Sequence, residues 1–461
     1  GWVSVPGTDN IFVGLSDGFT LGAGSPPHPK AATEWLRVAG GKEAQEKLNP
    51  LKGSICARTD CDPAVFGEYL QWALNNSQTG EMVGSMVHGA AAPPDFQQAF
   101  TDAITLFLVD GDVETFSSAL VQAAADSGLS SGAVAAPAEE SEEMEVATDL
   151  EEEVEIFTWW TSGGEAAAVQ QAFDTFNNYY PDTEIINATV AGGTGTNARA
   201  VLATRLSGGD VPDSWQALGG VGFKAQYIDT GYAAPLQDLF EEEGWFDVYP
   251  QLLLDMVSDE NGVPYMVPVN IHRANELWYN KAVVADAGVE IGETMTFDQF
   301  FEYAEAIKAS GVDPLCVGDS GIWTQAHLLE SVMVGKLGAD GWNGLWDGSV
   351  SFDDPKVKEA METYSQMLNY INSDHSALSW DQAVKKVIEG KCAFTVMGDW
   401  SYGEFVNAGM TDNVEFGWVS VPGTDNIFVG LSDGFTLGAG SPHHPKAATE
   451  WLRVAGGKEE Q

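Results

Sequence analysis

The chain has 461 residues, 44% of them hydrophobic, and carries 68 acidic side chains against 21 lysines and arginines, a formal net charge of −47. This length allows about two to four domains, while the charge excludes nucleic-acid binding, which needs a basic surface. No run of about 18 apolar residues predicts a membrane-spanning helix. The acidic excess favours a well-solvated surface in salt and offers multivalent cations many weak sites.

One stretch of 43 residues occurs twice. It runs from Gly1 to Glu43 and again from Gly417 to Glu459, an offset of 416, and the copies differ only at Pro27 and His443. A single domain has one place for such a stretch, so we interpret the chain as a window on a tandem array. The tail of one unit then comes first, and the head of the next unit follows it. A signal peptide upstream would lie outside this window.

The first part of the chain predicts strands followed by helices. WVSVPG and IFVGLSDGFTLG read as strands, and PKAATEWLRVAG reads as a helix that ends at paired glycines. Segments 63–78 and 94–127 are alanine-rich, with apolar residues at helical spacing. Residues 130–153 then predict a linker, because ten of the seventeen residues from 139 to 155 are acidic and repel one another. Bound cations or a neighbouring surface would allow this block to become a helix.

A new globular unit is expected to start at residue 154. VEIFTWW, TEIINATVAG and PDSWQALGG read as strands, and two helical segments separate them. This alternation predicts an α/β fold with a mainly parallel sheet that helices cover. It continues to the second copy of the repeated stretch.

Two glycine-rich motifs suggest enzymes but have simpler readings. GxSxG occurs at residues 14–18 and 430–434, but more strand follows it, whereas a hydrolase elbow needs a helix there. The run from Gly193 to Ala198 resembles a dinucleotide fingerprint, with Asp213 twenty residues from its start. Asp213 precedes the next strand instead of ending it, which favours a plain turn into a helix.

The four cysteines suggest two disulfides. Cys56 and Cys61 flank a short polar loop, and we predict a bridge between them in an oxidising compartment. Cys316 and Cys392 lie in strand-like runs, where a second bridge and buried free thiols are both open. No CxxC pair or His/Cys cluster indicates zinc.

Tryptophans carry the strongest functional signal. Trp159 and Trp160 end the first strand of the new unit, which is where a βαβ sheet binds ligands. Further tryptophans follow at 323, 342, 346 and 400. Aromatic platforms beside polar side chains suit sugars, which present apolar C–H faces and rings of hydroxyls. A single tryptophan is more often part of a core, but a Trp-Trp pair at the end of a strand favours a ligand.

At these residues the chain resembles a known family. IFTWWTSGGE, VPVNIHRANELWYN, WTQAHLLESV, SWDQAVKKVIEGKCAFTVMGDW, NPLKGSI and GSMVHGAAAP are similar to the glucose/galactose-binding proteins of ABC sugar importers, in the class of maltose-binding protein. The resemblance covers nearly everything except the linker. It implies a two-lobed periplasmic-binding-protein-like fold of type II, which closes on a sugar at a hinge.

Transferring this fold divides the chain across two tandem copies. Residues 1–130 would be the C-terminal part of one unit, with the end of its N-lobe and helices of its C-lobe. Residues 131–153 would be the acidic linker. Residues 154–461 would begin the next unit, with an N-lobe at 154–270 and 431–461 and a C-lobe at 275–428. The missing pieces of each unit would then come from neighbouring copies or chains.

The resemblance also implies a set of sugar contacts. The residues that carry over are Trp159, Trp160, Glu165, Gln216, His272, Trp323, Gln325, Asp399, Lys52 and His88. Relatives often carry Lys or His after the SWQ-type strand, and this chain has Leu218 there, so the loss of one sugar contact is expected. No metal and no cofactor are implied, apart from cations bound weakly at the acidic linker.

We therefore expect an extracellular or cell-surface protein, periplasmic in a cell with two membranes, that binds glucose, galactose or a similar monosaccharide. The alternative is a structural repeat in an extracellular filament or surface array, with or without sugar binding. An enzyme ranks third, because neither the motifs nor the family supply a catalytic centre. The expected partners are the sugar, neighbouring copies of the chain in a filament, and an ABC importer permease.

Overall fold

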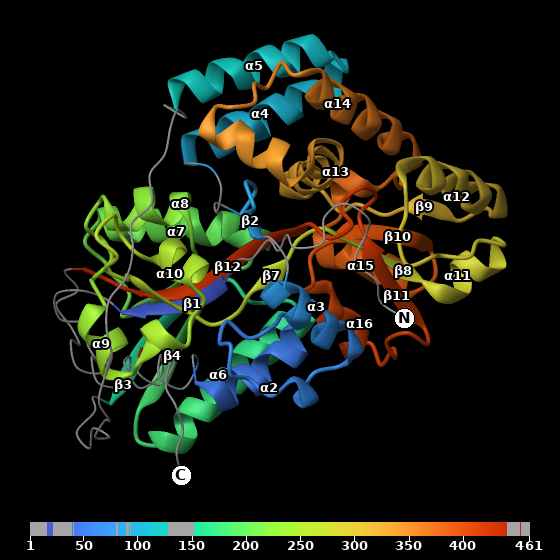
Figure 1. The fold of residues 1–461 in the computed structure, drawn as a ribbon. Helices are drawn as coiled ribbons and strands as arrows, with labels where there is room; N and C mark the ends of the chain where they lie inside the picture. The colour runs from blue at the N-terminus through green and yellow to red at the C-terminus, as the bar shows by residue number, and fades with distance from the viewer. Residues whose placement is uncertain are drawn as a thin grey trace.

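The computed structural model describes residues 16–21, 39, 41–79, 82–88, 92, 94–127, 152–439 and 452. Within these ranges the strands form two sheets, which helices cover, and the result is the two-lobed α/β arrangement in Figure 1. The first predicted strand, nearly all of the predicted helix PKAATEWLRVAG and nearly all of the acidic linker lie outside the described residues. No helix in the described part is both long and apolar enough to cross a membrane.

The larger sheet runs in the order β2-β12-β6-β1-β5-β3-β4, with β7 paired to β12. Its strands are β1 (Ser16–Leu21), β2 (Met82–Gly84), β3 (Glu153–Thr158), β4 (Glu184–Thr189), β5 (Ser214–Leu218), β6 (Met266–Pro268), β7 (His272–Arg273) and β12 (Phe428–Leu437). β3 is parallel to both β4 and β5, as the βαβαβ pattern predicts, and β12 runs antiparallel to β5 and β6.

The smaller sheet forms the centre of the second lobe, in the order β11-β8-β10-β9. Its strands are β8 (Glu276–Asn280), β9 (Asp313–Leu315), β10 (Cys392–Met397) and β11 (Phe416–Ser420). Strands β8, β10 and β11 are buried along their whole length. Continuous burial is expected where other elements cover both faces of a sheet.

Helices surround both sheets. They are α2 (Lys42–Lys52), α3 (Glu68–Thr79), α4 (Pro94–Asp110), α5 (Val113–Asp126), α6 (Gly163–Tyr179), α7 (Thr196–Ser207), α8 (Val221–Phe223), α9 (Gln237–Glu242), α10 (Gln251–Val257), α11 (Lys281–Asp286), α12 (Phe297–Ser310), α13 (Trp323–Asp347), α14 (Pro355–Met367), α15 (Trp380–Ile388) and α16 (Ser401–Asn407). Local signals define several of their ends. Thr296 makes a capping box at the start of α12, and Gly311 ends that helix with φ of 88°.

Residues 41–127 share their core with residues 152–439. Ile55 and Ile271 exchange backbone hydrogen bonds of 3.2 and 3.0 Å, and β2 pairs in parallel with β12. Tyr69 packs edge-on against Trp278, with ring centroids 5.2 Å apart. Figure 1 shows α4 and α5 beside α13 and α14, and both pairs of elements are in contact although they are distant in the sequence.

The described part of the N-terminal segment packs into the fold of the same chain, in an order that is circularly permuted relative to the one that the family resemblance implies. The segments NPLKGSI and GSMVHG thus fit the surface that residues 152–439 leave open. The division of residues 1–130 and 154–461 between neighbouring copies stays a prediction.

The two copies of the repeated stretch match one position in the larger sheet. Asp17 of β1 and Asp433 of β12 both pair with Leu218 of β5. Phe19 and Phe435 likewise both pair with Val267 of β6. The copies also lie parallel and in register with each other, as the blue and red strands of Figure 1 show. Because the two copies have the same sequence, both fit the same neighbouring strands. One copy would be enough to fill this position in the sheet.

Both glycine-rich motifs have the structure of their simpler readings. Ser16 and Ser432, at the centres of the two GxSxG runs, lie on strands β1 and β12, and neither stands at a strand-to-helix elbow. The glycine run 193–195 forms a short helical turn that leads directly into α7, with Thr194 at φ of 48°. Thr194 also borders the candidate site.

Candidate functional site

A hollow with about 330 Å³ of empty space lies where the ends of several strands and helices meet. Its lining consists of Lys52, His88, Trp159, Trp160, Glu165, Thr194, Leu218, His272, Trp323, Trp380, Trp400, Leu431 and Asp433. Seven of these, Lys52, His88, Trp159, Trp160, Glu165, His272 and Trp323, were predicted as contacts. The lining comes from both sides of the acidic linker, so both segments of the permuted chain are needed to form the pocket.

The paired tryptophans stand directly after β3, at the edge of the larger sheet. Both rings are almost fully buried, with Trp159 5% and Trp160 2% exposed. The Trp159 N–H donates to the side-chain oxygen of Gln216 at 3.2 Å, and the Trp160 N–H donates to the Thr158 hydroxyl at 3.2 Å. Gln216 therefore orients the pair from behind and does not line the hollow itself.

Lys52 and Glu165 form an ion pair inside the pocket. Lys52 is the last residue of α2 and is buried. Its ammonium lies 3.5 Å from a Glu165 carboxylate oxygen. It also lies over the rings of Trp160 and Trp400, at 5.4 and 5.7 Å from their centroids. Burial raises the pKa of Glu165, and the Lys52 charge opposes that rise. This buried cation and carboxylate can offer hydrogen bonds to the hydroxyls of a ligand.

His272 contributes another polar group, which two carboxylates flank. Its Nδ1 contacts a carboxylate oxygen of Asp399, and its Nε2 lies 3.6 Å from an oxygen of Asp433 and 3.1 Å from the Asn270 amide nitrogen. Burial lowers the pKa of His272 well below its usual value, and the Lys52 and His88 side chains lower it further. An imidazole nitrogen can donate or accept a hydrogen bond, so His272 offers the pocket a polar edge.

Three of the predicted sugar contacts, Gln216, Gln325 and Asp399, do not line the hollow. Asp399 is fully buried behind His272, and its second oxygen accepts the Arg273 N–H at 2.8 Å. Gln325 points into the second lobe, where it donates to Asp319 at 2.5 Å and accepts from a tyrosine hydroxyl at 2.8 Å. The structure thus gives these three side chains supporting positions, because their polar groups are already bonded to other residues.

The hollow also has lining residues that sequence reasoning did not predict as contacts. They are Thr194, Leu218, Trp380, Trp400, Leu431 and Asp433. Trp400 was recognised as an aromatic residue, but its neighbour Asp399 was preferred as the contact. Leu218, the expected departure from the family, lines the pocket with an apolar side chain. Trp380 begins α15 after a capping box at Ser379. This capping pattern in the sequence could have placed Trp380 at the start of a helix.

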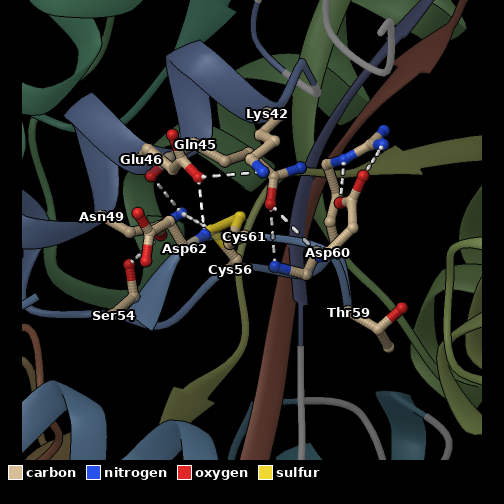
Figure 2. The surroundings of a disulfide bond; sticks show 12 residues. Lys42, Gln45, Glu46, Asn49, Ser54, Cys56, Thr59, Asp60, Cys61 and Asp62 are labelled. Carbon is tan, nitrogen blue, oxygen red and sulfur yellow. Dashed lines mark hydrogen bonds and ion pairs between the residues drawn. A yellow bond between two sulfur atoms is a disulfide. The ribbon is translucent and has the colours of Figure 1, made fainter. Parts of the chain in front are cut away.

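The structure contains the predicted disulfide between Cys56 and Cys61, with Cα atoms 6.5 Å apart. Figure 2 shows this bond beside α2, where Asn49 contacts Cys56 and Gln45 accepts the Ala57 N–H at 2.8 Å. The loop therefore folds back on the helix that ends with Lys52. At the second pair, for which a bridge and free thiols were both open, the structure has a disulfide with Cα atoms 6.0 Å apart. It ties β10 to the end of β9.

Comparison with known proteins places this pocket in context. The family described as bacterial extracellular solute-binding protein matches residues 160–461. The chain belongs to this family. As an extracellular solute-binding protein it is a receptor rather than an enzyme. The matched region includes most of the pocket lining, whereas Lys52, His88 and Trp159 precede it.

Two relatives and one solved structure illustrate the likeness of this solute-binding protein. An uncharacterized ABC transporter extracellular-binding protein of Pyrococcus horikoshii is 35% identical over 314 residues, which cover 68% of this chain and 70% of the relative. A probable sugar-binding periplasmic protein of Mesorhizobium japonicum is 33% identical over 308 residues, or 66% and 71% of the two chains. The structure of the bacterial solute receptor AcbH, described as exclusively preferring β-D-galactopyranose, has a TM-score of 0.56 at 16% identity and covers 66% of this chain and 76% of AcbH. The structural likeness shows that the two-lobed fold is shared.

Proposed function

We propose that this solute-binding protein binds one neutral monosaccharide, of the glucose or galactose kind, and presents it to the permease of an ABC importer. The observation that carries the proposal is the lining of the hollow, where five tryptophans surround the Lys52–Glu165 ion pair. Aromatic faces pack on the C–H faces of a sugar ring, while the ion pair and the neighbouring His272 bind its hydroxyls.

The charge of the lining supports a neutral ring. The carboxylates of Glu165 and Asp433 stand beside the single lysine in the lining, so an anionic sugar gains little from this pocket. The Mesorhizobium relative is described as a probable sugar-binding periplasmic protein, which supports the same ligand class. The preference for glucose or galactose rests on the motif resemblance, and Leu218 leaves one hydroxyl without a basic partner.

Isothermal titration calorimetry with glucose, galactose, xylose, arabinose and maltose tests the proposal. We expect one site per chain for a monosaccharide, with a dissociation constant of about 1 µM or tighter, and weaker binding of maltose. Trp160→Ala should abolish the heat, while Trp346→Phe, an aromatic change in the second lobe outside the pocket, should leave it unchanged. A folded protein that gives no heat with any sugar at millimolar concentration contradicts sugar binding.

A second candidate function is a structural repeat in a filament or surface array, and the matched strands β1 and β12 favour it. Both strands fit the same neighbours in the same register, so one copy is surplus within a single chain. In this arrangement residues 1–130 and 154–461 belong to successive units, and the surplus strand enters the sheet of a neighbour. Head-to-tail exchange of this kind is heterologous and grows open assemblies instead of closed dimers.

Analytical ultracentrifugation over a range of concentrations tests this second function. Strand exchange predicts assemblies that grow with concentration and that Phe19→Pro suppresses, since proline removes a ladder hydrogen bond. The sugar affinity should be unchanged in this variant, because β12 already fills the position next to β5. A chain that sediments as a monomer at all concentrations contradicts the filament and leaves the sugar-binding proposal intact.

A further inference from the structure

A cluster of three metal-ligating side chains lies beside the candidate sugar pocket. His88, His327 and Glu330 each bring one ligand atom to within 4.8 Å of the others. His88 follows β2, and the other two lie three residues apart on α13, which places them on one face of that helix. All three side chains are essentially fully buried, with exposures of 1%, 0% and 0%. The function proposed above does not use His327 or Glu330.

Three ring nitrogens of this cluster are buried without a hydrogen-bond partner among the described residues. They are His88 Nε2 and both ring nitrogens of His327. An unsatisfied buried polar group costs about 1–3 kcal/mol, so native proteins usually pair such groups or place an ion or water beside them. Three such atoms in one cluster point to an occupant.

Glu330 is buried without a basic partner. Its carboxylate accepts hydrogen bonds from the Ser85 hydroxyl and from the Met86 N–H at 2.8 Å, and no lysine or arginine in the described part of the chain forms an ion pair with it. A bound cation would supply the opposite charge that this carboxylate lacks, and neutral imidazoles are the form of histidine that binds metal.

Ser85 orients both the histidine and the carboxylate. Its hydroxyl donates to Glu330 at 2.9 Å, which leaves its oxygen to accept the Nδ1–H of His88 at 2.7 Å. His88 Nε2 is then the nitrogen with the free lone pair. Metal-binding histidines typically donate their other N–H to such a second group, which fixes the tautomer and raises the basicity of the ligand.

We propose that His88, His327 and Glu330 bind a single Zn²⁺ ion. Two imidazoles and one carboxylate match the three-ligand zinc sites that keep a fourth position open, whereas Mg²⁺ and Ca²⁺ need more oxygen ligands than this cluster offers. Tetrahedral zinc with bonds of about 2.0–2.1 Å needs ligand atoms about 3.3 Å apart, so the side chains rotate slightly on binding.

Equilibrium dialysis of the full chain, freed of metal and free of sugar, tests the site. The probe is Zn²⁺ alone, in excess Mg²⁺ so that the many surface carboxylates are already occupied. We expect one saturable Zn²⁺ per chain, and a loss of affinity of about 100-fold or more in both His327→Gln and Glu330→Gln. His375→Gln is the matched control: His375 is partly exposed, pairs with Asp319 at 2.7 Å and lies outside the cluster, so this variant should bind as the wild type does.

Two results would overturn the proposal. One is Zn²⁺ binding that Mg²⁺ removes entirely, which would assign it to surface carboxylates. The other is wild-type affinity in a folded His327→Gln chain. If a variant does not fold, Co²⁺ added to the unaltered protein decides the question, since one equivalent in this site should give the intense visible absorption of four-coordinate cobalt with nitrogen ligands. Only the weak absorption of six-coordinate cobalt would contradict the site.

Discussion

Lys52 and Glu165 meet at 3.5 Å inside the pocket although they lie on opposite sides of the acidic linker. Lys52 is the last residue of α2, and Glu165 stands in the first turn of α6. The two helices pack against each other. This pair links the permuted fold to the proposed function, because the pocket has its cation only when the early segment docks on the later one.

Replacing Lys52 by Met should weaken sugar binding and leave the fold intact. The change removes the only cation of the lining and leaves Glu165 without its partner, which should cost about 2–4 kcal/mol of binding free energy. Calorimetry with the best sugar measures the loss. Lys47→Met is the matched control, since Lys47 lies on the same helix, is exposed and pairs only with Glu43. Equal affinities in the two variants would exclude Lys52 from the site.

Asp399 should act on the ligand through His272. A double-mutant cycle with Asp399→Asn and His272→Gln measures whether the two side chains act together. If Asp399 only holds the imidazole, each single change weakens sugar binding about tenfold and the double change is hardly worse, with a coupling energy of about 1–2 kcal/mol. Additive losses would instead support the direct sugar contact that the sequence predicted for Asp399.

The Cys56–Cys61 disulfide should stabilise the fold by shortening the unfolded loop. Closing so short a loop is worth about 2 kcal/mol on the chain-entropy model. Urea unfolding of the Cys56→Ser/Cys61→Ser variant should therefore show a lower midpoint, with an unchanged dependence on urea concentration. Reductant added to the variant is the control, because Cys316–Cys392 stays available to it. An unchanged midpoint would show that the loop is held by its contacts with α2 alone.

Asp425 should make the stability of the protein fall as pH rises. Burial raises the pKa of this carboxyl to about 7 in the folded state, against an ordinary value of 3.8, although Arg273 opposes the rise. The folded chain thus binds this proton more tightly than the unfolded chain does. The resulting stabilisation is complete below about pH 4 and is lost as the pH rises through about 7.

Asp425→Asn removes this pH dependence. We therefore expect the difference in free energy of unfolding, variant minus wild type, to be about 2 kcal/mol larger at pH 8 than at pH 4. Thermal unfolding at a series of pH values measures the effect. Parallel curves for the two proteins would mean that Asp425 is ionised throughout.

Local patterns predicted the parts of the site that lie next to each other in the sequence. Trp159 and Trp160 could be assigned because a ligand meets a βαβ sheet at the ends of its strands. Lys52 and His88 needed the family resemblance, since nothing near them in the sequence marks a pocket. Asp433 was missed because its motif reads as a strand, and the side of the strand that faces the pocket depends on its pairing with β5 and β6.

The residues behind the pocket lining show a second limit of prediction from the sequence. Gln325 and Asp399 are polar and near tryptophans in the sequence, as sugar contacts are expected to be. Their side chains instead satisfy Asp319 and Arg273, partners that only the folded chain brings near. The repeated stretch has the same limit on a larger scale. Two identical strands predict the same neighbours, and the sequence alone does not say which copy uses them.

The central claim is that one chain forms its own sugar pocket from both sides of the acidic linker. It is tested most directly by mixing Lys52→Met and Trp160→Ala chains, unfolding and refolding them together, and titrating the mixture with the best sugar. A pocket formed within one chain always contains one of the two defects, so we predict no recovery of binding over the separate variants. If neighbouring chains exchange these segments, about a quarter of the pockets would combine an intact Lys52 with an intact Trp160. Recovery of binding to that level would contradict the account.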